Sequence, residues 1–311
     1  MLIASDRDQI KTPTAIALGN FDGIHQGHRS VLRSLVSSVN RDSSTTVCLS
    51  VVSFTPHPRE FFTGEKLQLL TPVPRKAELL ADLGIEQLVL LPFDRHLASL
   101  TPQEFVERIL VEQLQAKIVS VGEDFRFGYQ RQGTGADLQT LAAKYGIEVK
   151  LNSLHTCIDG GEAVRVSSSL IRQALSAGEM ETANQMLGRC YSLVGKVVTG
   201  KQLGRTIGFP TANLELDPAK FLPRFGVYAV DAWLTDNTTV KGIMNIGCRP
   251  TVAGESPTIE VHLLDWSGDL YGQDLRVELV DFIRPERKFD SVAALKQQIT
   301  QDCQLVLRNY P

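Results

Sequence analysis

Hydrophobic and polar residues follow two different periods along this chain, and the change falls near Gly188. In the first part, short apolar runs of the kind found in buried strands alternate with segments whose apolar residues recur at helical spacing. These patterns predict strands at residues 15–18, 47–53, 87–91, 118–122 and 147–151, and helices beginning near residues 24, 73, 101 and 134. Strands and helices that alternate with short connections favour a doubly wound α/β sheet of parallel strands.

A different organisation follows residue 157. The polar turn at residues 159–162 predicts a hairpin, and a helical segment is predicted from Ser167 through Met186. Residues 191–285 alternate with period two between turn residues, which predicts a closed or nearly closed antiparallel β-barrel. Residues 291–307 have apolar side chains at helical spacing, so we expect a C-terminal helix that packs on the barrel.

We therefore expect two domains, residues 1–187 and residues 188–311. A hydrophobic fraction of 43% and a charged fraction of 22% are typical of a soluble globular protein. The net charge of −3 leaves no basic surface for nucleic acid or for an anionic membrane. The charged N-terminus does not resemble a secretory signal, and no apolar run reaches the ~20 residues of a membrane span. Because the five cysteines are scattered, we expect them to be reduced and the protein to be cytoplasmic.

The strongest chemical signal is the pair His25 and His28, which follows the first predicted strand and a glycine-rich turn at residues 19–23. The pair stands at a helix entrance, where free N–H groups and the helix dipole attract phosphate. Gly27 and the glycines of the turn allow the backbone to approach such a ligand closely. Zinc binding is the alternative, but it needs further ligands, and His57 lies apart in a proline-flanked turn.

Two further segments follow predicted strands and carry aromatic residues. Phe54 and Pro58 belong to a stiff, proline-containing turn. Asp124, Phe125 and Phe127 lie between two glycines and can clamp a flat ring and its polar edge. Taken alone, the first segment is also explained as a rigid turn, and the second as an ordinary loop.

Ser168 and Ser169 begin a predicted helix, with Arg172 one turn inside it. This arrangement is either a simple serine N-cap or a second phosphate-binding helix start. Glu260 lies in an alternating strand, where a lone glutamate usually faces solvent.

The barrel part contains a loop punctuated by Gly200, Gly204 and Gly208, which leads into the segment Pro-Thr-Ala-Asn. Glycine loops alone are common and weakly informative. The hydroxyl of Thr211 and the side-chain carbonyl of Asn213 are more specific, because they are hard oxygen ligands suited to magnesium that also binds ATP phosphates.

These motifs resemble those of one family. Gly19-x-Phe21-Asp22-Gly23-x-His25-x-Gly27-His28 resembles the signature of the nucleotidylyltransferase superfamily, in the form found in prokaryotic bifunctional riboflavin kinase/FMN adenylyltransferases (FAD synthetases). Residues 166–172 resemble the family's Ser-Ser-Thr-x-Ile-Arg motif, with Ser169 at the threonine position. Residues 200–214 resemble the riboflavin kinase signature. The resemblance implies a Rossmann-like nucleotidylyltransferase domain followed by a riboflavin kinase-like barrel.

The resemblance also implies a role for each candidate residue. The catalytic residues would be His25, His28, Arg172 and Glu260. The ATP- and phosphate-binding residues would be Gly19, Phe21, Asp22, Gly23, Gly27, Ser168, Ser169, Gly200, Gly204, Arg205 and Gly208. The flavin-binding residues would be Phe54, Pro58, Asp124, Phe125, Phe127, Arg284 and Phe289, and the metal ligands Thr211 and Asn213.

The activity so implied is phosphorylation of riboflavin with ATP to FMN, and then transfer of AMP from ATP to FMN to give FAD and pyrophosphate. The expected cofactor is Mg²⁺ with ATP, and the expected partners are riboflavin, FMN, FAD, ATP, ADP and pyrophosphate. We expect neither nucleic acid nor a membrane as a partner. The sequence is compatible with a homo-oligomer as well as with a monomer.

Two other functions compete with this interpretation. One is a nucleotidylyltransferase for a different phosphoryl substrate, with a barrel that only binds flavin. Against it stand the Pro-Thr-Ala-Asn segment and Glu260, which a passive barrel would not need. The other is a flavin-sensing regulator on a degenerate scaffold, against which stand the intact His25, His28 and Arg172.

Overall fold

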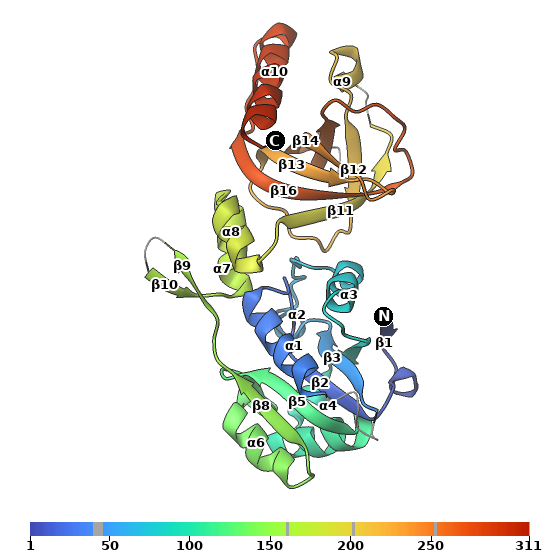
Figure 1. Ribbon diagram of the computed structural model, residues 1–311, viewed down its shortest axis with the longest axis vertical. Coiled ribbons are helices and arrows are strands. Elements are labelled where there is room, and N and C mark those ends of the chain that lie inside the picture. Colours follow the sequence, from blue (N-terminus) through green and yellow to red (C-terminus); the bar gives the residue numbers. More distant parts are fainter. Residues whose placement is uncertain (40–45, 160–161, 201–202, 252–253, 311) are drawn as a thin grey trace. The chain divides into compact units, whose positions relative to one another are not determined.

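The computed structural model describes residues 1–39, 46–159, 162–200, 203–251 and 254–310. The chain divides into two compact units, Met1–Ser168 and Ser169–Pro311. The first unit contains an open α/β sheet and the second a closed barrel (Figure 1). The fold class predicted from the sequence is therefore confirmed.

The first unit is built on a six-stranded sheet in the order β1-β4-β3-β2-β5-β8, in which every pairing is parallel. All five predicted strands are present. β1 escapes prediction, because its three residues are too few for a periodic signal. The strands are β1 (Leu2–Ala4), β2 (Thr14–Leu18), β3 (Cys48–Thr55), β4 (Gln87–Pro92), β5 (Ala116–Gly122) and β8 (Glu148–Asn152).

Two separate apolar cores cover the faces of this sheet, and alternate residues of β2 belong to different ones. Ala15 and Ala17 pack with helices α1 and α3, whereas Ile16 and Leu18 pack with η2 and α6. Both faces are thus covered by helices, as a doubly wound sheet requires. The helices are α1 (Gln26–Ser38), α3 (Val73–Ala81), the π-helix η2 (Phe105–Gln113) and α6 (Gly135–Ala143).

The helix predicted near residue 101 begins as expected but changes type. Thr101 and Glu104 form a capping box around the short helix α5 (Pro102–Glu104), which continues directly into η2. The predicted hairpin is present as β9 (Thr156–Asp159) and β10 (Glu162–Arg165). The remaining elements of this unit are η1 (Arg7–Gln9), α2 (Pro58–Thr63), α4 (Arg95–Ser99), β6 (Arg126–Phe127), η3 (Tyr129–Arg131) and β7 (Gly133–Thr134).

The single helix predicted through Met186 is wrong, because two helices occupy that segment, α7 (Ser168–Ala177) and α8 (Met180–Leu187). Gly178 interrupts them with a φ of 83°, in the left-handed region that glycine adopts readily. α8 packs on the barrel: the side-chain amide of Asn184 donates to the carbonyl of Leu279 at 3.0 Å and accepts from the N–H of Tyr191 at 2.7 Å. These helices therefore belong to the second unit.

The barrel closes in the order β11-β12-β15-β14-β13-β16, and its pairings are antiparallel. The predicted barrel is thus present and fully closed. Its elements are β11 (Tyr191–Val198), α9 (Leu203–Thr206), β12 (Ala212–Leu216), β13 (Gly226–Trp233), β14 (Thr239–Thr251), β15 (Gly254–Leu263) and β16 (Asp274–Pro285).

The predicted C-terminal helix is present as α10 (Val292–Asn309), which lies against the outside of the barrel (Figure 1). Val306 of α10 is buried with Val227 and Ala229 of β13 and with Ile243 of β14. Among the residues described, no helix is long and apolar enough to cross a membrane.

Candidate active sites

His25 and His28 lie together at the entrance of α1. His25 is the N-cap residue, and its Nδ1 accepts a hydrogen bond from the backbone N–H of His28 at 3.3 Å. The two rings are stacked with their centroids 3.6 Å apart, and the ring of Phe21 lies 5.0 Å from that of His28. The pair therefore presents two imidazoles at the positive end of the helix dipole, where phosphate is favoured.

The turn that precedes the pair has an unusual backbone. Phe21 and Ile24 are fully buried, and their φ angles are 47° and 40°. Side chains of this size rarely adopt the left-handed region, and each such residue costs about 1–3 kcal/mol. Gly23 shares this region with a φ of 89°, whereas Gly19 lies at its border with 158°. Residues held in such conformations cluster at functional sites, which agrees with a ligand-binding turn.

Asp22 shapes this turn through its carboxylate. The carboxylate accepts hydrogen bonds from the backbone N–H groups of Leu70 (3.1 Å) and Thr71 (2.9 Å). The Thr71 hydroxyl in turn accepts from the N–H of Gly23 at 2.9 Å, and the Ser168 hydroxyl donates to the carbonyl of Asp22 at 2.8 Å. Asp22 and Ser168, two candidates far apart in sequence, are thus brought together beside the histidines.

Lys76 is a residue of this site that the sequence patterns do not indicate, since a lysine in a helical pattern normally lies on the surface. It is only 5% exposed, and its Nζ donates to the carbonyl of Asn20 at 2.8 Å. Burial lowers the pKa of Lys76, and the nearby Asp22 carboxylate opposes that shift. The lysine therefore helps to hold the turn from α3.

The zinc alternative gains no support from the residues described, because no group of three histidine, cysteine, aspartate or glutamate side chains among them is arranged to hold a metal. His57 instead caps α2, with its Nδ1 accepting from the N–H of Arg59 at 3.0 Å.

An aromatic cluster is formed by the end of β3, by α2 and by the residue that follows β4. Phe54, Phe61 and Phe62 all contact Phe93 edge-to-face, with centroids 5.4–5.8 Å apart. Phe62 is 71% exposed, which is unusual for phenylalanine, and Pro58 begins the helix that carries it. Of these rings, the sequence patterns single out Phe54 alone.

The loop after β5 carries three other candidates. Asp124 is exposed and pairs with Arg165 of the hairpin. The ring of Phe125 is stacked on that of Phe127 with centroids 5.9 Å apart. Phe127 itself is buried and contacts Phe105, so it belongs to the core beneath the loop.

Ser169 and Arg172 lie on α7. Ser169 is exposed, and the Arg172 guanidinium lies 5.8 Å from the ring centroid of Phe221, which belongs to the connection between β12 and β13. Both residues fall in the second unit, and Ser168 in the first.

Gly200 and Gly204 of the barrel lie close to the Pro-Thr-Ala-Asn segment. A Cβ at Gly200 would lie 2.3 Å from the side-chain nitrogen of Asn213. A Cβ at Gly204 would lie 2.2 Å from the carbonyl oxygen of Phe209 and 3.3 Å from the hydroxyl of Thr211. Gly208 has a φ of 89° with open space around it, and Arg205 is exposed on α9.

Gly204→Ala is therefore expected to displace this loop and to lower any phosphotransfer by the barrel by about tenfold or more, since small misplacements in an active site have effects of this size. The loss is measured as the rate of riboflavin phosphorylation by the variant relative to the wild type. Adenylyl transfer in the same preparation is the control, and equal losses in both would point to unfolding instead.

Glu260 belongs to a row of residues that pair across neighbouring strands. It lies opposite Asn213 of β12 on one side and opposite Asn245 of β14 on the other. The row continues through Val227 of β13 to Arg284 of β16. Directly paired residues place their side chains on the same face of a sheet, and Val227 identifies this face as the one on which α10 packs. The sequence alone does not indicate that Asn245 lies directly opposite Glu260.

A cavity of about 440 Å³ lies on the same part of the barrel. Phe209, His262, Trp266, Cys303 and Leu307 contribute to its lining. The ring of His262 contacts that of Phe209 edge-to-face at 5.5 Å. The thiol of Cys303 is neutral at physiological pH, because burial, reinforced by the adjacent carboxylate, raises its pKa to about 11. The lining is largely apolar, which suits a flat heterocycle.

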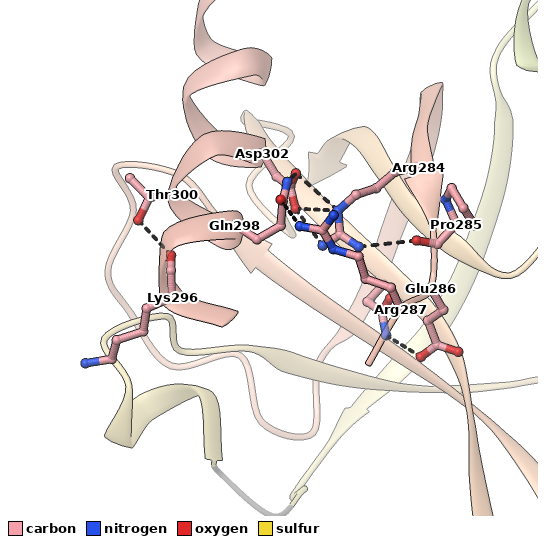
Figure 2. A network of polar contacts seen from close by, with 9 residues as sticks. Arg284, Pro285, Glu286, Arg287, Lys296, Gln298, Thr300 and Asp302 are labelled. Atoms are coloured by element: carbon pink, nitrogen blue, oxygen red, sulfur yellow. Dashed lines mark hydrogen bonds and ion pairs between the residues drawn. The ribbon is translucent and has the colours of Figure 1, made fainter. Parts of the chain in front are cut away.

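Arg284 lies at the end of the row. Its guanidinium is paired with the carboxylate of Asp302 on α10 (Figure 2). The guanidinium also lies 5.7 Å from the ring centroid of Phe289, which follows β16. Arg287 also lies against this ring, at 4.8 Å.

The first unit has a helix entrance that favours phosphate, and the barrel has a glycine loop near a strand that carries Glu260. This combination is typical of a two-part enzyme of the nucleotide-dependent transferase class. A family model described as FAD synthetase matches residues 7–170, and one described as riboflavin kinase matches residues 187–310. The chain belongs to the bifunctional riboflavin kinase/FMN adenylyltransferase family, as its motifs predict.

Individual relatives agree with this assignment. The bifunctional riboflavin kinase/FMN adenylyltransferase of Escherichia coli (strain K12) is 41% identical over 288 residues, covering 92% of this chain and 90% of that protein. The protein of the same name from Haemophilus influenzae is 39% identical, covering 93% and 91%. A crystal structure described as a macrolide-efflux protein from Streptococcus pneumoniae matches with a TM-score of 0.86 and 31% identity, over 100% of this chain and 99% of that chain.

Proposed function

We propose that this chain phosphorylates riboflavin with ATP to give FMN, and then transfers AMP from a second ATP to FMN to give FAD and pyrophosphate. The observation that carries the proposal is the row in which Glu260 stands between Asn213 and Asn245, with Gly200 close to Asn213. A barrel that only binds flavin has no need of a carboxylate and oxygen ligands beside a phosphate loop.

In the kinase reaction, Glu260 acts as the base. Its carboxylate accepts the proton of the primary hydroxyl of riboflavin while that oxygen attacks the γ-phosphorus and ADP leaves. The loop with Gly200, Gly204 and Gly208 covers the phosphates, and Arg205 stabilises their charge. The adenine of ATP occupies the apolar cavity beside Phe209, which places the phosphates toward the glycine loop.

Thr211 and Asn213 are the proposed magnesium ligands. Their hydroxyl and carbonyl oxygens are of the kind that Mg²⁺ prefers, and Gly200 leaves the Asn213 side chain the space that a Cβ would fill. Thr211 and Asn213 would hold the ion, and when bound it would neutralise phosphate charge.

In the adenylyl transfer, His25 and His28 stabilise the transferring phosphate as an oxygen of the FMN phosphate attacks the α-phosphorus of ATP. No covalent enzyme intermediate is needed. Ser168, Ser169 and Arg172 hold the leaving pyrophosphate portion, by resemblance of their motif. The turn with Gly19, Phe21, Asp22, Gly23 and Gly27 supplies the backbone around the nucleotide.

For the flavin of this second reaction we propose the cluster of Phe54, Phe61, Phe62 and Phe93, with Pro58 at its border. An exposed phenylalanine within a rigid aromatic cluster is suited to contact a flat ring. Asp124 and Phe125 contact the flavin from the loop after β5, with Phe127 supporting Phe125 from below.

In the kinase reaction, Phe289 contacts the riboflavin ring, and Arg284 contributes to the same site. We assign adenylyl transfer to residues 1–187 and phosphorylation to residues 188–311. We propose that the protein works in the cytoplasm and has neither nucleic acid nor a membrane as a partner.

Incubation of the purified chain with riboflavin, ATP and magnesium tests this function. We expect FMN to form first and FAD afterwards, with ADP and pyrophosphate as the other products. EDTA in excess over magnesium is expected to stop both steps. If neither riboflavin nor FMN causes ATP consumption, the proposal is wrong.

A further inference from the structure

We propose that Asp302 of α10 is a positioning residue of the kinase site, which holds Arg284. Through this ion pair it fixes α10 beside both the proposed riboflavin contact, Phe289, and the proposed nucleotide cavity next to Phe209. The inference rests on the proposed kinase function and deepens it. No sequence motif indicates Asp302, because a single aspartate in an amphipathic helix is normally exposed.

Asp302 is one of few buried charged residues, being only 2% exposed. Its carboxylate accepts from Arg284 twice over, from Nη2 at 2.8 Å and from Nε at 3.0 Å. Gln298, one turn earlier on α10, donates to the other carboxylate oxygen at 2.7 Å. Figure 2 shows these groups converging between α10 and the end of β16. Nη2 and Nε both donate to Oδ2, and Nε also lies 3.2 Å from Oδ1, so the carboxylate restricts the orientation of the guanidinium.

The same network holds the segment that follows β16. Arg287 donates to Gln298, and Asn245 donates to Glu286 at 3.3 Å. Arg284 and Arg287 both lie against the ring of Phe289, the proposed riboflavin contact. Asp302 therefore acts on Phe289 through Arg284, without needing to touch the flavin.

Helix α10 also connects Asp302 to the proposed nucleotide cavity. Cys303 is the next residue after Asp302, and Leu307 follows one turn later; both line the cavity beside Phe209. Arg284 is the last member of the row that contains Glu260, so the ion pair fixes α10 on the face where the proton acceptor stands. The buried Asp302 side chain thus positions residues that line both proposed substrate sites.

The test compares Asp302→Asn with the wild type in the full chain. The asparagine keeps the size of the side chain but removes the charge that orients Arg284. We expect the KM values for riboflavin and ATP in the kinase reaction to rise roughly tenfold, with kcat changed less, because Glu260 is untouched. Conversion of FMN to FAD is expected to stay at the wild-type rate.

Tyr310→Phe is the matched control. It removes a second contact of the α10 region with β16, the hydrogen bond from the Tyr310 hydroxyl to Asp281 at 2.6 Å, and leaves the ion pair in place. A merely structural role predicts that both variants lower Tm and the fraction of active protein, with KM unchanged. KM values for Asp302→Asn within about twofold of the wild type would therefore overturn the inference.

If Asp302→Asn does not fold, Gln298→Met replaces it, because this variant removes the hydrogen bond that orients the Asp302 carboxylate and leaves Arg284 and Asp302 in place. Raised KM values in this folded variant support the inference, and wild-type values refute it. Failure of the proposed function is distinguishable, because the wild-type chain would then form no FMN at all.

Discussion

Replacing Glu260 with glutamine is expected to lower the rate of FMN formation from riboflavin by about 10²–10⁴-fold, the range for loss of a general base. Glutamine has the size of glutamate but cannot accept the proton of the riboflavin hydroxyl. The pairing of Glu260 with Asn213 and Asn245 is made by the backbones of β12, β14 and β15, so the substitution leaves the row intact. Separation of riboflavin, FMN and FAD over time measures the effect.

Glu278→Gln is the control for this variant, because Glu278 lies on β16 of the same barrel, where it faces Arg276 at 3.7 Å. It is expected to phosphorylate riboflavin at the wild-type rate. Supplied with FMN directly, Glu260→Gln should still form FAD normally. If Glu260→Gln formed FMN at the wild-type rate, Glu260 would not be the proton acceptor of the kinase reaction.

The architecture could be predicted from the sequence because the spacing of hydrophobic residues reflects which side chains are buried. The alternation of Ile16 and Leu18 with Ala15 and Ala17, for example, reflects two cores on opposite faces of one sheet. The pattern failed at Gly178, where apolar residues continue at helical spacing on both sides of a left-handed glycine. Hydrophobic spacing does not record a break in the backbone when buried residues continue on both sides of it.

The candidate sites were partly accessible for a similar reason. His25 and His28 are close in sequence, so their meeting follows from local geometry alone. The neighbours of Glu260 and Arg284 depend on strand register and on the docking of α10, which no local pattern encodes. The pairing of Asn245 with Glu260 and the burial of Asp302 against Arg284 could therefore be recognised only in the folded chain.

His28→Ala is expected to lower the conversion of FMN to FAD by about 10²–10³-fold, as is typical when a donor to a transition-state anion is lost. The phosphorylation of riboflavin should remain unchanged. His28 is a cleaner target than His25, because the N-cap bond of α1 joins the His25 ring to the backbone N–H of residue 28, which alanine retains. His25→Ala would also remove the cap, at a cost of about 1 kcal/mol in stability.

His96→Ala serves as the matched control, since His96 is exposed on α4 and takes part in neither proposed reaction. It should leave both reactions unaffected. The comparison of the two histidines of α1 then separates chemistry from folding: His28→Ala should retain the wild-type Tm while adenylyl transfer falls, whereas His25→Ala should lower both. If His28→Ala instead lowered Tm and both activities in parallel, the stacked imidazoles would be a packing feature of the helix entrance, and the transferring phosphate would have to be stabilised elsewhere.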